Sequence, residues 1–326
     1  GVPQALIVRR FLLDRKEEVI VKLVRELLEL FKIRVLDLEE ECGEEQADFA
    51  ILSVRHEIAM DPMPAVHTEL FAVEETGEER RFSIGGAARQ GEKAMAAVHR
   101  LVKLNLYRLF RTHFDMPAAA WGILHGVRPT KIVHRFIEAG LSREEIVVRL
   151  LEDYEVSLEK ASYMTAMAFR QRPFLQTSDE RTISVYVGIP FCRSRCLYCS
   201  FPAYILPNDE QLSDFFAAWD KDLAAAKREI ERHRLKVQSI YIGGGTPTSL
   251  SPANAERLLA TIRTCLPLAN DYELTLEGRI HDLIPEKMDV WMAGGVNRMS
   301  LGVQSFDTKV RRQVGRLDDK ETVLKN

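Results

Sequence analysis

Long hydrophobic runs are missing from this 326-residue sequence, and none approaches the roughly 20 apolar residues that a transmembrane helix needs. We therefore expect no membrane span. The N-terminus lacks a basic region followed by a short apolar core and a small-residue cleavage site, so we also expect no signal peptide. The first residue is Gly1 rather than Met, which indicates a trimmed end.

A strong charge of either sign is missing as well. The sequence has 45 Lys and Arg residues against 48 Asp and Glu residues, for a formal net charge of −3. This near balance gives no reason to expect nucleic acid or a membrane surface as a partner. The sequence also lacks low-complexity segments, and its 46% hydrophobic and 29% charged content is typical of a soluble globular protein.

Cysteine is scarce, with only five residues in the chain. A small, odd number argues against a disulfide scaffold and favours the reducing cytoplasm. Three of the five, Cys192, Cys196 and Cys199, fall within eight residues with the spacing Cys-x-x-x-Cys-x-x-Cys. Clustered thiolates usually bind metal, and soft sulfur ligands select iron–sulfur clusters or zinc. We expect Cys42 and Cys265, which stand apart, to be structural.

The number of thiolates helps to separate these two metals. A structural zinc site normally takes four ligands in two separated pairs, and the sequence offers no second pair. Three close thiolates instead fit a cluster with one metal position left open, where a cofactor or substrate could bind. A zinc-binding α/β protein is the alternative, and iron and sulfide analysis of an anaerobic preparation would separate the two.

The length of the chain exceeds that of one typical domain, so we expect more than one. In the first half, hydrophobic periodicity predicts a strand, a helix, an antiparallel sheet ended by Gly85 and Gly86, and a long helix, over residues 5–13, 17–31, 34–84 and 92–113. Two shorter helices follow, the first with a capping box at Ser142 and Glu145. We predict an α+β N-terminal domain over residues 1–115, a helical connector over 116–180 and a further domain over 181–326, with the boundary in the polar stretch 171–181.

Two basic features of the first half have an ordinary and a functional interpretation. The predicted helix 92–113 carries Arg100, Lys103, Arg108 and Arg111, and we expect a solvated face rather than a binding surface. The stretch 121–131 combines two glycines and a proline with Arg128 and Lys131. A tight turn between helices explains both glycines. An anion-binding corner for substrate carboxylates is the functional alternative.

From residue 183 the pattern changes to strands and helices in alternation. The predicted strands cover residues 183–187, 239–242, 272–276 and 298–303, and the predicted helices cover 209–233, 252–264 and 285–293. This order is typical of an α/β fold with parallel strands joined by right-handed crossovers. A motif follows each strand: the cysteines, residues 243–247, residues 277–279 and residues 302–306. Because the carboxyl ends of parallel strands share one rim, we expect these motifs to form one active site.

The residue types of these motifs suit a polar ligand. The glycines of residues 243–245 would let the backbone approach a ligand and turn its amides toward an anion, although three glycines also make an ordinary turn. Glu277 could bind a ribose hydroxyl pair or an amine, and Gln304 could donate to and accept from a polar group. The ordinary alternatives are a surface carboxylate and a loop amide. His233 and His281 lack the spacing of metal ligands.

Three of these motifs resemble those of a known enzyme family. Tyr186-Val-Gly-Ile-Pro-Phe-Cys192 with its two further cysteines, Tyr241-Ile-Gly-Gly-Gly-Thr-Pro-Thr248, and the run from Asn297 to Phe306 are similar to the radical S-adenosylmethionine (SAM) enzymes. More narrowly, they resemble the oxygen-independent coproporphyrinogen III oxidase family. The stretch 121–131 is similar to the HemZ branch of that family, which has an extra N-terminal domain. The resemblance implies a partial (β/α) radical SAM barrel preceded by an α+β domain and a helical connector.

The resemblance also implies a role for particular residues. Three irons of a 4Fe–4S cluster would be held by Cys192, Cys196 and Cys199. The fourth iron would be chelated by S-adenosylmethionine, whose methionine end would contact Gly244, Gly245 and Thr246. Further positions that match cofactor contacts in the family are Glu277, Gln304 and Arg316. Tyr186 matches a family tyrosine next to the cluster and is the candidate catalytic residue.

The activity implied by the resemblance is the oxidative decarboxylation of coproporphyrinogen III to protoporphyrinogen IX in anaerobic haem synthesis in the cytoplasm. Reduced flavodoxin or ferredoxin would supply electrons, and a 5′-deoxyadenosyl radical would take hydrogen from a propionate. The alternatives are a haem-binding carrier or chaperone of the same family, and a radical enzyme with a non-porphyrin substrate. The N-terminal domain is expected to cap the substrate side without a catalytic residue of its own.

The sequence departs from the family pattern at several positions. Gly188 stands where relatives often have His, and Phe201 where the best-defined oxidases have a fourth cysteine. The Glu277-Gly-Arg-Ile run lacks the usual Glu-x-Asn-Pro. Only four barrel strands fit before Asn326, and residues 310–325 are predicted to form one helix, so we expect a C-terminally truncated barrel. These departures bear on the substrate more than on the cluster.

Overall fold

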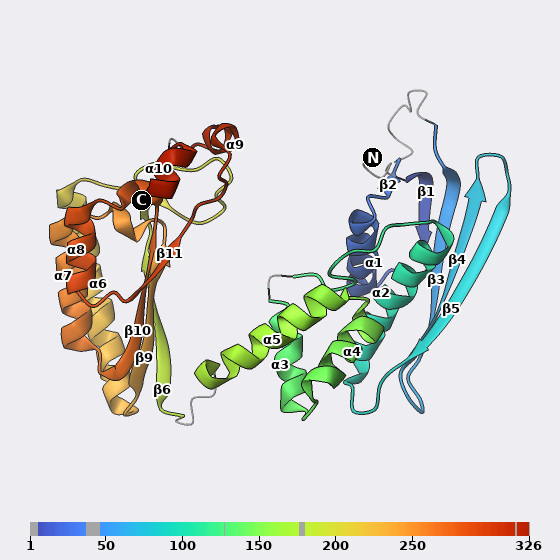
Figure 1. Ribbon diagram of the computed structural model, residues 1–326, viewed down its shortest axis with the longest axis horizontal. Coiled ribbons are helices and arrows are strands. Elements are labelled where there is room, and N and C mark those ends of the chain that lie inside the picture. Colours follow the sequence, from blue (N-terminus) through green and yellow to red (C-terminus); the bar gives the residue numbers. More distant parts are fainter. Residues whose placement is uncertain (1–5, 37–45, 127, 176–179, 317, 326) are drawn as a thin grey trace. The chain divides into compact units, whose positions relative to one another are not determined.

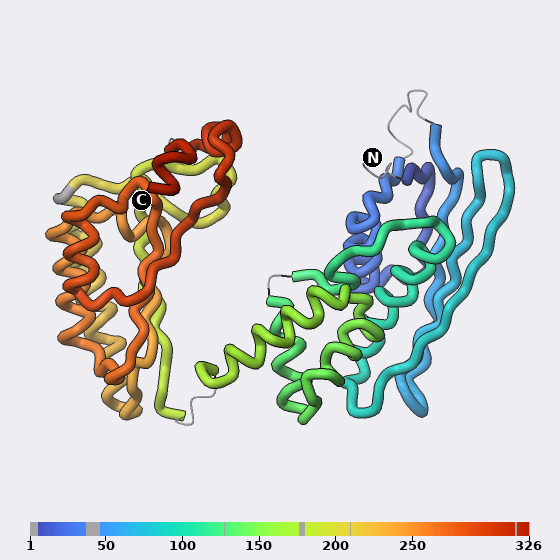
Figure 2. Tube along the Cα trace, in the orientation of Figure 1, coloured from blue at the N-terminus to red at the C-terminus, as the bar shows by residue number. Residues whose placement is uncertain are grey.

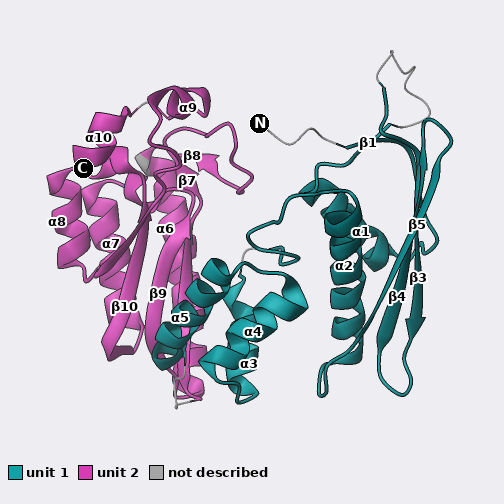
Figure 3. Ribbon diagram, turned by 45° about the vertical axis from the view of Figure 1, so that its right-hand side comes forward, with its two compact units in different colours: residues 1–176 teal, residues 177–326 magenta. Residues whose placement is uncertain are grey.

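The computed structural model describes residues 6–36, 46–126, 128–175, 180–316 and 318–325. The chain divides into two compact units, residues 1–176 and 177–326 (Figure 3). The helical segment predicted as a connector lies almost wholly within the first unit. None of the helices in the described parts of the chain is both long and apolar enough to cross a membrane.

The first unit contains a five-stranded sheet in the order β2-β1-β3-β4-β5. Its strands are β1 (Ile7–Leu13), β2 (Arg34–Val35), β3 (Phe49–Ala59), β4 (Ala65–Glu74) and β5 (Glu79–Ala87). The predicted antiparallel hairpins are confirmed for β3, β4 and β5, but the sheet as a whole is mixed, because β1 runs parallel to both β2 and β3. Helix α1 (Glu18–Leu30) returns the chain between β1 and β2 and so permits the parallel pairing. Gly85 and Gly86 do not end the sheet, since both pair with β4.

Helix α1 and helix α2 (Ala94–His113) lie against one face of this sheet (Figure 1). The prediction that the basic residues of α2 form a solvated face is wrong at two positions. Arg100 is only 7% exposed and lies 2.7 Å from the Glu92 carboxylate, while Lys103 is 8% exposed and donates to Glu26 over 3.1 Å. Both cations are packed inside the unit because a carboxylate partner offsets the loss of hydration.

Three helices complete the first unit: α3 (Thr130–Glu138), α4 (Arg143–Tyr154) and α5 (Leu158–Leu175). The capping box at Ser142 and Glu145 is confirmed, with both reciprocal hydrogen bonds present at the start of α4. Helix α5 continues through Pro173 to Leu175, so part of the stretch predicted as a polar connector is helical.

The second unit is built on a parallel sheet in the order β11-β10-β9-β6. Its strands are β6 (Thr182–Ile189), β9 (Lys236–Gly244), β10 (Leu268–Gly278) and β11 (Arg298–Leu301), which confirms the predicted parallel arrangement. Helices α6 (Asp209–Arg232), α7 (Pro252–Cys265) and α8 (Pro285–Ala293) cover one face (Figure 1). Val187 and Ile189 are buried in the core of this unit, whereas Tyr186 between Val185 and Val187 is 62% exposed.

Short elements surround the carboxyl end of this sheet. The strands β7 (Phe191–Cys192) and β8 (Tyr204–Ile205) pair with each other, and the 3-10 helices η1 (Pro247–Ser249) and η2 (Ile280–Asp282) follow β9 and β10. The loop that carries the cysteines thus leaves β6 through β7 and returns through β8.

The C-terminal segment corrects one prediction. The single helix expected over 310–325 is two helices, α9 (Thr308–Gln313) and α10 (Lys320–Lys325). Gly315 between them has a φ of +80°, a conformation that suits glycine and ends α9. In Figure 2 this C-terminal segment (red) lies beside the cysteine loop (yellow-green). A hydrogen bond from the Arg316 guanidinium group to the Tyr198 hydroxyl connects the two segments.

The isolated cysteines have different outcomes. Cys265 is half-buried at the end of α7 and packs against the core of the second unit, which confirms its structural placement. Cys42 lies outside the described residues.

Candidate functional site

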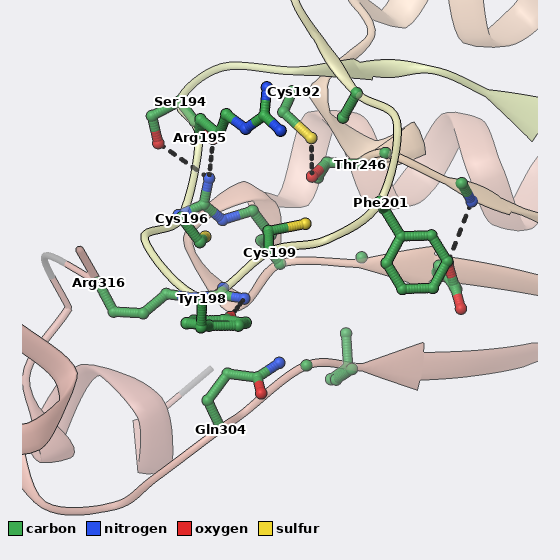
Figure 4. A pocket seen from close by; sticks show the side chains of 18 of the residues that line it. Cys192, Ser194, Arg195, Cys196, Tyr198, Cys199, Phe201, Thr246, Gln304 and Arg316 are labelled. Atoms are coloured by element: carbon green, nitrogen blue, oxygen red, sulfur yellow. Dashed lines mark hydrogen bonds between the residues drawn. The ribbon is translucent and has the colours of Figure 1, made fainter. Parts of the chain in front are cut away.

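A pocket of about 270 Å³ lies at the carboxyl end of the sheet in the second unit (Figure 4). Every cysteine of the motif and every residue predicted to contact the cofactor lines it: Cys192, Cys196, Cys199, Gly244, Gly245, Thr246, Glu277, Gln304 and Arg316. The four motifs therefore meet on one rim, as the order of strands predicts. Tyr186 is not among the described residues that line this pocket.

The glycine run holds the backbone that leads into the cysteine loop. The amide of Gly245 donates to the Ile189 carbonyl over 2.8 Å, and the amide of Thr246 donates to the Phe191 carbonyl over 2.7 Å. A Cβ on Gly245 would lie 2.6 Å from the Phe191 carbonyl oxygen, so only glycine fits without a shift of the backbone. The expectation that the glycine amides turn toward an anion is therefore wrong for Gly245, whose amide is bound to a carbonyl within the protein.

Side chains fasten the cysteine loop at further points. The Thr246 hydroxyl donates to the Cys192 sulfur over 3.3 Å. Arg279 donates to the Ser194 hydroxyl over 3.1 Å. Arg193 lies 3.5 Å from the carboxylate of Asp282, whose side chain is only 3% exposed. The cysteines are thus positioned by residues that follow β9 and β10.

Sequence reasoning missed all three of these contacts. Arg193 and Ser194 stand between the cysteines, where the motif itself tolerates any residue. Asp282 ends the 3-10 helix η2 after β10, and an acidic residue in such a short segment is expected to be solvated. The one sequence feature that could have indicated these contacts is that the residues lie close, along the chain, to the cysteine motif or to Glu277.

Glu277 is bound on both carboxylate oxygens. It accepts a hydrogen bond from the Tyr241 hydroxyl over 2.7 Å and one from the Gly244 amide over 3.3 Å. Burial raises the pKa of Tyr241, contact with Ser300 opposes this shift, and the Glu277 carboxylate adds to it. The phenol therefore stays protonated as a donor. Tyr186 stacks on Tyr241, with ring centroids 5.9 Å apart. Burial raises the pKa of Tyr186, and the nearby Glu277 carboxylate adds to this shift, so Tyr186 lies beside a pocket residue without lining the pocket itself.

Arg316 is a buried cationic residue that lines the pocket. It is 6% exposed, and one terminal nitrogen donates to the Tyr198 hydroxyl over 2.9 Å. Its Nε is buried and has no hydrogen-bond partner among the described residues. An unpaired buried N–H is costly, so this nitrogen is suited to a ligand oxygen. Gln304 lies on the same side of the cysteine loop (Figure 4), in a left-handed conformation with φ +69°.

The three thiols suit an iron–sulfur cluster better than a single ion. Cys192, Cys196 and Cys199 are free and half-buried around the pocket. Among the described residues, no three His, Cys, Asp or Glu side chains are arranged to hold one metal ion. A tetrahedral zinc ion needs its ligands to converge on one point, whereas the thiolates of a 4Fe–4S cluster each bind a different iron. The carboxylate of S-adenosylmethionine also suits the free Nε of Arg316.

The other residues singled out in the sequence lie in varied places. Phe201 lines the pocket and is 62% exposed. Gly188 is on β6, where a Cβ would meet the Tyr186 ring at an ordinary 3.7 Å. In the first unit, Arg128 and Lys131 line a separate hollow of about 550 Å³ beside α3 and α5.

Comparison with known proteins adds an independent line of evidence. Residues 186–326 match the model of the Radical SAM superfamily. The chain is 30% identical over 299 residues to the oxygen-independent coproporphyrinogen-III oxidase-like protein HemZ of Bacillus subtilis, covering 85% of this chain and 56% of that protein. It is 35% identical over 139 residues to the heme chaperone HemW of Escherichia coli, covering 41% of this chain and 35% of that protein.

A solved structure is similar over a smaller part. The coproporphyrinogen III oxidase HemN of Escherichia coli, described as a radical SAM enzyme, aligns with a TM-score of 0.41 and 27% identity, covering 49% of this chain and 36% of that one. The chain spans less than two thirds of each of these three proteins. It is a radical SAM protein related to the HemZ and HemN oxygen-independent coproporphyrinogen oxidases, with its radical SAM domain in residues 186–326.

Proposed function

We propose that this protein is a radical enzyme of anaerobic haem synthesis that converts coproporphyrinogen III to protoporphyrinogen IX. The observation that carries the proposal is the pocket that combines three free thiols with the buried, unpaired Nε of Arg316. The cluster and S-adenosylmethionine, when bound, supply one-electron chemistry that removes a hydrogen atom from the substrate. Loss of carbon dioxide, with transfer of one further electron to an external one-electron acceptor, would then leave a vinyl group in place of the propionate.

The chain's own residues would bind and orient the two molecules. Cys192, Cys196 and Cys199 would hold the cluster. Arg316 and Gln304 would bind the polar end of S-adenosylmethionine, beside Gly244, Gly245 and Thr246. Glu277 keeps Tyr241 and the glycine run in place. Tyr186 stays a prediction as a catalytic residue, since it stacks on Tyr241 beside Glu277 and does not line the pocket itself.

The rest of the pocket suits a flat molecule with carboxylates. Exposed apolar side chains line it at Phe201, Tyr204, Ile205 and Leu301. Such a cluster of exposed apolar groups is typical of a binding site. Arg195 and Arg279 line the same pocket and carry the charge that carboxylates require. A tetrapyrrole with propionate side chains has both features.

The test is an anaerobic incubation of the reconstituted protein with S-adenosylmethionine, a reductant and coproporphyrinogen III. We expect 5′-deoxyadenosine and a vinyl-bearing porphyrin product, identified by mass. Cys196→Ala should lose the cluster absorption and both products. Reduced flavodoxin or ferredoxin should replace the chemical reductant, as expected for a cytoplasmic enzyme. Cofactor cleavage without any porphyrin product would contradict the proposed substrate and favour a non-porphyrin one.

A haem carrier is the second candidate. The similarity to the heme chaperone HemW falls on 139 residues, and the exposed apolar side chains of the pocket suit haem as well as its precursor. This alternative predicts tight haem binding without turnover. Titration of the same protein with haem, with the product assay run in parallel, separates a carrier from an enzyme.

A further inference from the structure

Arg311 is the most deeply buried charged residue that the chemistry above leaves unused. It lies in α9 at 0% exposure, seven residues after the pocket residue Gln304. Its guanidinium group donates to four protein oxygens, three on carbonyls and one on a carboxylate. A buried cation with so many partners holds its surroundings firmly, because each bond would be costly to leave unmade.

Two of these bonds grip the backbone on both sides of Gln304. Nη1 of Arg311 donates to the Val303 carbonyl and, over 3.0 Å, to the Ser305 carbonyl. Gln304 between them has a φ of +69°, a left-handed conformation that is costly for a residue with a side chain. The guanidinium group therefore stabilises the left-handed backbone conformation that sets the direction of the Gln304 side chain.

The other two bonds reach the turn that carries Arg316. Nε donates to the Asp318 carbonyl over 2.8 Å, and Nη2 lies 3.1 Å from the Asp318 carboxylate. The Arg316 amide donates to the Arg311 carbonyl over 2.8 Å. The Arg311 side chain thus contacts the backbone on both sides of Gln304 and also Asp318, two residues after Arg316, whereas the bond to Arg316 itself comes from the Arg311 carbonyl. Lysine, with a single nitrogen and no planar fork, cannot make the same set of side-chain bonds.

We propose that Arg311 is a positioning residue for S-adenosylmethionine, which acts by holding Gln304 and Arg316 in their binding arrangement. This inference rests on the cofactor part of the proposed function and not on the porphyrin substrate. Arg311 contacts the backbone next to Gln304 and close to Arg316 but does not line the pocket itself. Its loss should therefore weaken cofactor binding while the cysteines keep the cluster.

The experiment compares Arg311→Lys with Arg312→Lys, a matched change at the exposed neighbour on the same helix. S-adenosylmethionine binding to the anaerobic, cluster-loaded protein is measured by calorimetry. A second readout is the change that S-adenosylmethionine causes in the electron paramagnetic resonance spectrum of the reduced cluster. We expect Arg311→Lys to bind about tenfold more weakly with unchanged iron and sulfide content, and Arg312→Lys to match the parent protein.

A double variant tests whether the effect runs through the pocket residues. If Arg311 acts by holding Gln304 and Arg316, then Arg311→Lys added to Gln304→Ala should cause a smaller loss than Arg311→Lys causes alone, because only the part that runs through Arg316 remains. Fully multiplicative losses, or normal binding by Arg311→Lys, would overturn the inference. Should Arg311→Lys fail to fold, Asp318→Asn keeps the contacts to Val303 and Ser305 and should show a smaller loss of the same kind. Normal binding by Asp318→Asn would then overturn the inference.

The assay contains no porphyrin, so its outcome is separate from that of the product assay. Parent protein that binds S-adenosylmethionine but makes no porphyrin product would contradict the proposed substrate and leave the role of Arg311 standing. Parent protein that holds a cluster but does not bind S-adenosylmethionine would overturn that role.

Discussion

The hydroxyl group of Thr246 donates a hydrogen bond to the sulfur of Cys192 over 3.3 Å. The amide of the same threonine donates to the Phe191 carbonyl over 2.7 Å. Thr246 therefore holds both the backbone and the sulfur at the first cysteine. The glycine run places Thr246 there, so the glycine and cysteine motifs form one structural unit at the rim of the sheet.

Replacing Thr246 by Val should lower the reduction potential of a cluster bound at Cys192. Hydrogen bonds to cluster sulfur stabilise the more negative, reduced state, and Val removes one such bond. A redox titration followed by electron paramagnetic resonance measures the potential. Thr246→Ser, which keeps the hydroxyl, is the control and should retain the parent value. An unchanged potential in Thr246→Val would show that the hydroxyl does not act on the cluster.

Gly245→Ala should disturb the cysteine loop and reduce cluster content. The new Cβ would lie 2.6 Å from the Phe191 carbonyl oxygen and 2.8 Å from the Phe191 nitrogen, so the backbone must move. Overpacking of this kind costs about 1–3 kcal/mol in the free energy of unfolding. Gly188→Ala on the neighbouring strand is the matched control, because its Cβ would meet only the Tyr186 ring at 3.7 Å. Equal iron content and unfolding temperature in the two variants would contradict this account.

The second unit was largely predictable because local signals agreed with the fold. Strand and helix alternation gave the parallel order, and the motif after each strand gave the pocket residues. Tyr186 is the exception. Its position beside the cysteine motif says nothing about which face of β6 it occupies relative to the pocket, and the structure stacks it on Tyr241 instead.

Burial of charge was not predictable, because it depends on contacts between distant parts of the chain. The sequence pattern at Arg311 is that of an exposed helical arginine. The residue is buried because the loop around Gln304 and the turn at Asp318 pack over it. The same packing divides the expected C-terminal helix in two. In the first unit, hairpin signals gave the antiparallel pairs of β3, β4 and β5. They missed the parallel pairing of β1 with β3, because it joins segments that no hairpin connects.

The stability of the first unit should fall as the solution is acidified below pH 6.5, because of His56. This residue is 1% exposed, and its Nδ1 lies 2.9 Å from the Thr68 hydroxyl. Burial lowers the pKa of His56 from 6.5 to about 4; Asp14 opposes this shift and Arg15 adds to it. The unfolded chain therefore takes up a proton between these values that the folded chain does not, at a cost of about 3 kcal/mol by pH 4.

Denaturant unfolding at several pH values checks this dependence. The contribution of His56 should be fully present above pH 6.5 and lost progressively toward pH 4. His56→Asn keeps a polar atom near the Thr68 hydroxyl but does not titrate in this range, so its stability should depend less on pH than that of the parent. Identical pH profiles for the two proteins would exclude His56 as the cause.

Arg128→Ala should leave the cluster and its cofactor intact, because every residue proposed to bind them lies in the second unit. Arg128 precedes α3 in the first unit and lines a hollow with Lys131 and His134. If the turn at residues 121–131 is only structural, porphyrin turnover by Arg128→Ala should stay close to that of the parent. If it binds substrate carboxylates, KM should rise while cofactor cleavage without substrate is unchanged. Lys131→Ala, measured in the same way, would show whether the two cations act together. Complete loss of turnover by Arg128→Ala, with fold and cluster intact, would contradict our expectation that the first unit carries no catalytic residue.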